Sequence, residues 1–280
     1  MNIKSKLLNL EKKSILLHKA INIYRWLHIA FHRMKFFSSQ MYRKYGGKQT
    51  CYHPLLKLKN AYSGQRCFIL ATGPSLKIED VLLLRNEVTF GMNSICKLYS
   101  KTDWRPTFFG IQDIFVYDKL ADELKTVQEP TVFIGNNIAS KRIVPKEWIR
   151  FPLDVWYHAY DQYINQKFFA KFSANCYEVV YDGFSITYSL IQLAVYMGFK
   201  EIYLLGADCT FSSKGGNHFA EHGANDIYIS SAQERNFVMY RKAKEYADIH
   251  GIKIYNATRG GALEVFPRVC LENIFGLKKL

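Results

Sequence analysis

The stretch CFILATGPSLKIED, Cys67 to Asp80, decides the fold class of this chain of 280 residues. Its uninterrupted apolar run is typical of a strand buried on both faces, and the charged segment after it has helical character. Between them, Gly73 lets the backbone turn sharply, Pro74 fixes the turn and Ser75 can cap the next helix. Amides at a helix N-terminus favour phosphate or carboxylate, so this turn either binds an anion or is an ordinary connection. It matches neither the Walker loop nor the dinucleotide fingerprint.

Short apolar runs and helical patterns continue to alternate after this stretch. The runs in which we expect strands are RCFILAT, EVTFGMN, PTFFGIQD, TVFIG, EIYLLGAD and KIYNAT. One long helix should start at Ser185, and a second should extend from about Ser231, which has capping-box spacing to Glu234, to His250 before Gly251. Strands separated by helices predict an α/β, Rossmann-like fold, with a mostly parallel sheet covered by helices on both faces, plus a basic N-terminal helical segment.

The positive charge is concentrated at the N-terminus. The chain has a formal net charge of +14, and residues 1–50 hold eight Lys and three Arg against the single acid Glu11. A nucleic-acid-binding core would spread its cations over its main face, so we expect no nucleic acid partner. Residues 1–50 are predicted to be a basic amphipathic helical extension of a catalytic domain at 51–280. The extension either lies on an anionic membrane surface or packs on the body of the protein or on a second subunit, as in a homo-oligomer.

Other features point to a cytoplasmic protein, which would be peripheral at the inner face of the membrane. The six cysteines are scattered without a C-x-x-C pair, and no signal peptide is evident, so reduced thiols are expected. The uncharged stretch 183–199 contains several polar side chains and is predicted to be a buried helix instead of a membrane span.

Small or polar residues follow three further expected strands. They are Asn93 and Ser94, then Gln112 and Asp113, then Gly206, Ala207 and Asp208. A parallel sheet brings such strand ends to one edge, where ligands of α/β proteins bind. Each of these residues could merely cap a helix, but together with Gly73 and Ser75 they suggest a binding cleft.

The glycine-rich loop SSKGGNHFAEHGAND, residues 212–226, is long and polar, which is typical of a functional flap. Its H-x-x-E-H string resembles an inverted zinc motif, but that motif requires a helix and the glycines favour a loop. A histidine that takes a proton from an acceptor hydroxyl fits better, and a solvated loop histidine is the alternative. Asn256 and Arg259, near the end of the last expected strand, are candidates to contact a phosphate or carboxylate. For Arg259 the alternative is a surface salt bridge.

The motifs GPSL, GFSITYSLIQLAVYMGFKEIYLLGAD, NHFAEHG and IKIYNAT resemble the bacterial sialyltransferases of the Campylobacter lipooligosaccharide type. They also resemble a broader set of Rossmann-like domains, which includes motility accessory factors and archaeal 6-hydroxymethylpterin diphosphokinases. The NAT-x-G-G ending is closer to that broader set. The resemblance covers roughly residues 66–268.

The sialyltransferase resemblance implies that Gly73, Ser75 and Asn93 contact the CMP part of a donor. It also implies that His222, the second histidine of an H-aromatic-x-x-H string, is the catalytic base. It implies no metal, because tyrosines after the G-x-D strand hold the donor phosphate in those enzymes. This chain has Thr210 where one such tyrosine is expected. Arg259 or Tyr228 would then stabilise the leaving phosphate, and a CMP-linked sugar is only one possible donor.

We therefore expect a metal-independent glycosyltransferase of bacterial surface polysaccharide synthesis, such as capsule or lipopolysaccharide, with a nucleotide-sugar donor and a glycan or lipid-linked acceptor. The residues predicted to bind the nucleotide or donor are Gly73, Pro74, Ser75, Asn93, Ser94, Asp113, Ser185, Asp208 and Thr210. Those predicted to contact acceptor or phosphate are His218, Glu221, Asn256 and Arg259. One alternative is an ATP-dependent diphosphokinase-like transferase with Mg²⁺ on Asp113 and Asp208. Another is a non-catalytic nucleotide-binding scaffold.

Overall fold

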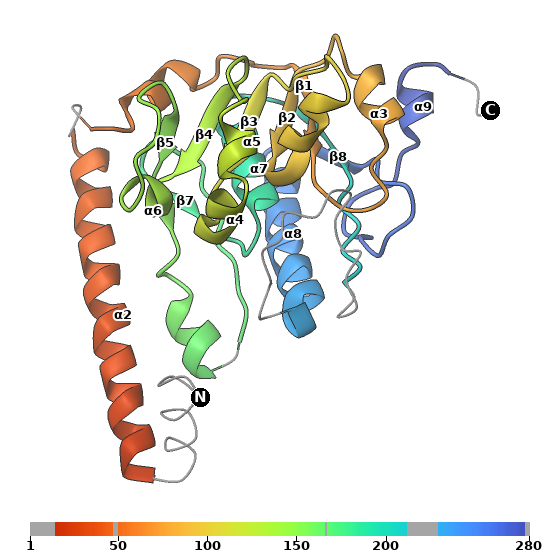
Figure 1. Cartoon of the computed structure of the whole chain (residues 1–280). Helices are drawn as coiled ribbons and strands as arrows, with labels where there is room; N and C mark the ends of the chain where they lie inside the picture. The colour runs from red at the N-terminus through yellow and green to blue at the C-terminus, as the bar shows by residue number, and fades with distance from the viewer. Residues whose placement is uncertain (1–14, 47–49, 166, 212–228, 278–280) are drawn as a thin grey trace.

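A computed structural model describes residues 15–46, 50–165, 167–211 and 229–277 of the chain (Figure 1). Its centre is a seven-stranded sheet in the order β5-β4-β3-β2-β1-β8-β9, in which every neighbouring pair is parallel. The strands are β1 Arg66–Leu70, β2 Thr89–Met92, β3 Phe108–Ile111, β4 Thr131–Gly135, β5 Ile149–Phe151, β8 Glu201–Leu205 and β9 Lys253–Asn256. The predicted α/β, Rossmann-like fold is confirmed.

The order of the strands changes direction beside β1. From β1 the chain adds β2 to β5 on one side, and it then returns to place β8 and β9 on the other side. The junction between β1 and β8 is therefore the topological switch point, and the crevice beyond the carboxyl ends of its strands is the expected ligand site in such folds.

Both faces of the sheet are covered, which explains the continuous apolar runs of its strands. Within β1, Cys67 and Ile69 face one core while Phe68 and Leu70 face the other, and all four side chains are fully buried. The first core also contains residues of helices α7 Ile186–Tyr196 and α8 Ala232–Ile249. The second contains residues of α3 Ile78–Leu83, η2 Asn93–Ser100, α4 Ile114–Lys119, α5 Ala121–Leu124, α6 Asn136–Ala139 and α9 Leu271–Ile274.

The two long helices of the first core follow their predictions except at one cap. The helix predicted after Ser185 is α7, which is buried along almost its whole length. Gly251 has φ +62 and ends α8 as predicted. However, the expected capping box is wrong, because Ser231 makes no side-chain cap hydrogen bond. Ser231 closes the short turn η4 Ile229–Ser231 with φ −106 and ψ 4, whereas a capping serine needs an extended backbone.

The sequence analysis left the region after β4 without strands, and the structure places three there. Besides β5, two-residue strands β6 Leu153–Asp154 and β7 Val180–Tyr181 pair in parallel as a second small sheet. A π-helical turn, η3 Asp161–Asn165, follows β6. The Asn136 side chain of α6 accepts a 2.9 Å hydrogen bond from the Leu153 amide, so the small sheet is fixed beside the end of β4.

The N-terminal helix α2, Ile15–Lys44, lies on the β5 side of the body and is followed by the turn η1 His53–Leu58 (Figure 1). Near its C-terminus the buried Arg43 donates hydrogen bonds of 3.0 and 2.6 Å to the Glu178 carbonyl, ahead of β7. Further back, His32 stacks on Trp156, which follows the carboxyl end of β6, with ring centroids 4.3 Å apart. The helix therefore extends against the strand direction, and its first half projects past the carboxyl edge of the sheet. No helix in the described ranges has both the length and the apolar character that crossing a membrane requires.

Candidate functional site at the carboxyl edge of the sheet

Two turns meet at the switch point between β1 and β8. Ser75 Oγ, in the turn after β1, donates a 2.8 Å hydrogen bond to Asp208 Oδ2, in the turn after β8. The Gly73 amide donates a 2.8 Å hydrogen bond to the Gly206 carbonyl beside them. Pro74 lies exposed on the outer side of the turn. The structure thus joins residues that are more than 130 positions apart and that the sequence analysis assigned to one site.

The glycine at position 73 is required by this contact between the turns. A Cβ at Gly73 would lie 1.9 Å from Asp208 Oδ2 and 2.4 Å from the Gly206 carbonyl oxygen. These separations are far below a van der Waals contact, so any side chain would force the two turns apart. On this side of Gly73, Asp208 and Gly206 fill the space next to the backbone.

The end of β2 contributes polar atoms that have no hydrogen-bond partner among the described residues. Asn93 has φ +47, and its Oδ1 atom is buried without a hydrogen bond, as is the Oγ atom of the fully buried Ser94. Leaving a buried polar group unpaired costs about 1–3 kcal/mol, so such groups are rare unless a ligand or water supplies the missing bond. The side-chain atoms of Asn93 and Ser94 can therefore form hydrogen bonds with a ligand at the predicted donor-binding position.

Backbone strain gathers at the same edge. Of the four non-glycine residues with positive φ in the described part of the chain, three follow or precede elements here: Asn93, Phe184 and Cys209. Such conformations cost roughly 1–3 kcal/mol each and are concentrated at functional sites of proteins. The surrounding structure must therefore hold the turns after β2 and β8 and the turn before α7 in these conformations.

Ser185 begins α7 next to the end of β2. Its Oγ accepts a 3.3 Å hydrogen bond from the Thr187 amide, which is the expected N-cap contact. The Thr187 hydroxyl lies 3.4 Å from Met92 Sδ, directly before Asn93. The start of α7 and the unpartnered atoms after β2 therefore belong to one neighbourhood.

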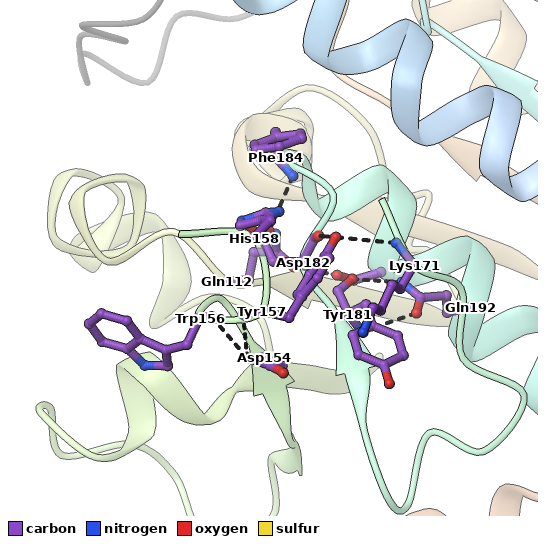
Figure 2. Close-up of polar contacts among 11 residues, drawn as sticks. Gln112, Asp154, Trp156, Tyr157, His158, Lys171, Tyr181, Asp182, Phe184 and Gln192 are labelled. Atoms are coloured by element: carbon purple, nitrogen blue, oxygen red, sulfur yellow. Dashed lines mark hydrogen bonds and ion pairs between the residues drawn. The ribbon is translucent and has the colours of Figure 1, made fainter. Parts of the chain in front are cut away.

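A polar cluster that the sequence analysis missed supports the start of α7 (Figure 2). Asp182 Oδ1 accepts hydrogen bonds of 3.3 Å from the Phe184 amide and 3.1 Å from Gln112 Nε2, and its Oδ2 lies 3.4 Å from His158 Nε2. His158 is only 1% exposed, stacks on Phe184 with centroids 4.5 Å apart, and leaves its Nδ1 without a hydrogen bond. Because these residues come from separate segments, only the D-G-F-S string before α7 could have suggested Asp182.

Gln112 connects this cluster to the sheet. The Ser189 hydroxyl of α7 donates a 2.6 Å hydrogen bond to Gln112 Oε1, and the Asn137 side chain donates a 2.7 Å bond to the Gln112 carbonyl. The end of β3 is thereby locked to α7 and to α6. Its neighbour Asp113 is exposed, and one of its oxygens accepts hydrogen bonds of 2.7 and 3.1 Å from the Phe115 and Val116 amides as the N-cap of α4.

Asp113 and Asp208 are too far apart to hold one metal ion. They follow β3 and β8, which are separated by three strand spacings in the order β3-β2-β1-β8. At about 4.8 Å per spacing their backbones are ~14 Å apart, which exceeds what two aspartate side chains around one ion can span. The Mg²⁺ ligands expected for the diphosphokinase alternative stay a prediction, and the strand order argues against one ion shared by both carboxylates. Within the described ranges, no three His, Cys, Asp or Glu side chains gather where they could hold a metal.

The turn after β8 presents Thr210 to solvent and buries Cys209. Burial, followed by the nearby Asp208 carboxylate, raises the pKa of the Cys209 thiol to about 12, so this cysteine stays protonated. Behind the turn, the Thr258 hydroxyl accepts a 3.0 Å hydrogen bond from the Ala207 amide. The loop after β9 thus supports the turn that carries Asp208.

The side chains of Asn256 and Arg259 both form contacts within the protein. Asn256 is fully buried. Its side-chain Nδ2 donates a 2.7 Å hydrogen bond to the Leu263 carbonyl, and its Oδ1 accepts one of 3.0 Å from the Thr258 backbone amide. Arg259 pairs with both oxygens of the buried Asp80 and, at 2.5 Å, with Glu272. The pKa of Arg259 is raised, first by its hydrogen bond to Asp80. The expected salt-bridge alternative for Arg259 therefore describes this structure.

The residues of the predicted flap, His218, Glu221 and His222, lie outside the described residues, as does Tyr228. Two surface grooves occur elsewhere on the molecule and contain none of the predicted donor-binding residues. One of about 460 Å³ lies along α2, and one of about 570 Å³ lies between α8 and the segment 262–265.

Comparison with known proteins gives one family and a set of distant folds. The MAf glycosyltransferase of Magnetospirillum magneticum AMB-1 superposes with a TM-score of 0.49 at 14% identity, over 79% of this chain and 38% of that one. The sialyltransferase CstII of Campylobacter jejuni, solved with the substrate analogue cytidine-5'-monophosphate, gives a TM-score of 0.40 at 17% identity, over 77% of this chain and 85% of that one. This chain thus spans well under half of the Magnetospirillum protein.

No curated protein matches the chain. The family model described as 6-hydroxymethylpterin diphosphokinase MptE-like matches residues 39–214, which include β1 to β8 and the predicted donor-binding turns. The match confirms the resemblance to the broader set of Rossmann-like domains that the motifs indicated. The chain belongs to the MptE-like family.

Proposed function

We propose that the protein is a group transferase that binds a nucleotide at the carboxyl edge of its sheet and transfers a sugar from a nucleotide-sugar donor. The observation that carries the proposal is the meeting of Ser75 and Asp208 at the switch point, where the hydroxyl and carboxylate are 2.8 Å apart. Nucleotides bind at this position in doubly wound folds. The adjoining unpartnered atoms of Asn93 and Ser94 supply hydrogen-bonding capacity for a base, ribose or phosphate.

The chemistry that we propose is transfer of the sugar to a glycan or lipid-linked acceptor, as in bacterial surface polysaccharide synthesis. His222 takes the proton from the acceptor hydroxyl, since a neutral imidazole is a competent base near pH 7. The assignment of His222 rests on the H-aromatic-x-x-H spacing in the sequence. The start of α7, with its N-cap Ser185, offers partly positive amides to the donor phosphate, and no metal is invoked.

The second candidate is a diphosphokinase-like transfer of a diphosphate group from ATP to an acceptor hydroxyl, with AMP as the leaving group, which the name of the family favours. This reaction normally uses Mg²⁺ bridging the nucleotide phosphates. The separation of Asp113 and Asp208 argues against the metal ligands that we first considered for it. A non-catalytic nucleotide-binding scaffold is the third candidate.

A thermal-shift screen distinguishes the three. A ligand that binds only the native state raises the unfolding midpoint. We expect CMP, UDP or GDP to stabilise the protein equally with EDTA and with Mg²⁺, and the matching nucleotide-sugar to be consumed when an acceptor is added. Stabilisation by ATP only when Mg²⁺ is present would favour the diphosphokinase. Nucleotide binding without consumption of any donor would favour the scaffold, and no response to any nucleotide would overturn the proposed site.

A further inference from the structure

The outward face of α2 is apolar although no part of the described protein covers it. The exposed large side chains at Leu16, Ile23, Leu27, Phe31 and Met34 are between 55% and 81% exposed. Their spacing of seven, four, four and three residues places them on one side of the helix, opposite the residues that contact the body. Continuous apolar surface of this kind marks an interaction site in soluble proteins.

Positive charge borders this face without any negative charge. The segment Ile15–Lys44 contains no Asp or Glu, and Lys19, Arg33, Lys35 and Lys44 are exposed. A second copy of α2 would therefore oppose cation to cation, with no carboxylate on either helix to pair them. An anionic lipid surface complements the same pattern, since each Lys or Arg near it contributes about 1 kcal/mol of binding.

The apolar surface continues sideways into the groove along α2. Trp26, Ile29 and Phe37 line this groove together with Tyr160, which lies beyond β6. Aromatic side chains favour the membrane interface, and the open groove, which Arg33 also lines, offers space for acyl chains beside the inserted face.

We propose that α2 binds an anionic lipid bilayer through this outward face and lies in the plane of the interface. The body of the protein then sits on the water side, held through Arg43 and through the stack of His32 on Trp156. Because α2 runs against the strand direction, the strands then lie along the membrane plane, and the carboxyl edge of the sheet opens parallel to the bilayer surface (Figure 1).

The experiment measures vesicle binding without donor or acceptor, so its outcome is independent of catalysis. The full chain is sedimented with phosphatidylcholine vesicles that contain either no phosphatidylglycerol or a third of it. We expect binding to the anionic vesicles only, and weakening as salt is added. In the variant Leu27→Ser/Phe31→Ser and in Lys19→Glu/Lys35→Glu, the partition coefficient should fall at least about tenfold.

Matched controls are exposed residues of the same kinds on other elements. Ile249→Ser removes a side chain that is 79% exposed on α8, and Lys101→Glu/Lys119→Glu reverses two exposed cations near β3. Both controls should bind vesicles as the parent protein does. Equal loss in the controls, or equal binding to neutral vesicles, would overturn the proposal.

A second measurement uses tryptophan fluorescence. Trp26 is 52% exposed, while Trp104 and Trp148 are buried and Trp156 is covered by His32. Brominated lipids should therefore quench fluorescence that the Trp26→Phe variant lacks. If bromolipids quench nothing and sedimentation instead shows a dimer that Leu27→Ser/Phe31→Ser dissociates, the face joins two copies of the chain and the lipid proposal is wrong.

Discussion

Ser75 Oγ and Asp208 Oδ2 form a 2.8 Å hydrogen bond between the turns that follow β1 and β8. Asp208 is only 7% exposed, and its other support comes from the loop after β9, where the Ala262 amide donates a 2.7 Å bond to the Asp208 carbonyl. Together these two hydrogen bonds join three segments of the chain at the switch point of the sheet. A nucleotide that binds here meets a rigid edge, which is what donor positioning requires.

Replacing Ser75 with alanine should weaken nucleotide binding about tenfold, since it removes a hydroxyl and leaves the Asp208 carboxylate without its partner. Isothermal titration with the nucleotide found in the thermal-shift screen measures the change. Ser100→Ala is the control, because Ser100 is an exposed serine whose hydroxyl donates a hydrogen bond to the Lys97 carbonyl, away from the carboxyl edge. Unchanged affinity in Ser75→Ala would remove Ser75 from the site.

Gly73→Ala should lower the free energy of unfolding by about 1–3 kcal/mol, as overpacked sites do. The cause is the collision of a Cβ with Asp208 Oδ2 and the Gly206 carbonyl. Urea denaturation of Gly73→Ala, Asp208→Ala and the double variant measures the coupling. Removing the Asp208 side chain should relieve part of the loss, so strictly additive losses would contradict the clash with Asp208.

The Arg259 ion pairs predict a specific response to acid. Hydrogen bonds from Cys270, from the Glu272 backbone and from Arg259, in that order, lower the pKa of Glu272 from 4.5 to about 2. A carboxyl group whose pKa is depressed by folding stabilises the fold above its unfolded pKa, and this contribution disappears as the pH falls toward its folded pKa. The Glu272→Gln variant should therefore lose less stability than the parent between about pH 4.5 and 2. Denaturant titrations across that range measure it, and parallel pH profiles would contradict the assignment.

The sheet could be predicted because its strands are buried on both faces and therefore appear as apolar runs in the sequence. The residues at its carboxyl edge could be predicted because parallel strands end at the same edge. Strands β5, β6 and β7 could not, since three or two residues carry no periodicity. Arg259 pairs with Asp80, which is 179 positions away in the sequence. His158 follows β6 and contacts Asp182, which follows β7, because these two strands pair in the small sheet. Contacts between distant segments leave no local pattern in a single sequence.

His222→Ala should lower kcat by about 10²–10⁴-fold with little change in donor affinity, because proton removal matters in the transition state and hardly at all in donor binding. Steady-state kinetics with the identified donor and a soluble acceptor measure both quantities. His218→Ala is the matched control from the same loop and should keep most of the activity. The reverse result would move the base to His218, and loss of bound Zn²⁺ together with activity in both variants would favour the zinc alternative.

His158 should act on nucleotide binding by positioning, because it holds Phe184 and not the ligand itself. Its ring lies on Phe184 with an interplanar angle of 5°, and Phe184, with φ +68, directly precedes the N-cap of α7. His158→Ala should weaken nucleotide binding by about three- to tenfold, within the range of a lost aromatic contact, whereas His158→Phe should restore it by keeping the stack. His250→Ala is the control. It removes a histidine at the C-terminal end of α8 whose ring is stacked 3.9 Å from the ring of Tyr246, and it should leave nucleotide affinity unchanged. A lower melting temperature without a change of affinity in His158→Ala would limit His158 to stabilising the fold. Failure of His158→Phe to restore binding would instead assign the effect to the Asp182 contact, which Asp182→Asn would then reproduce.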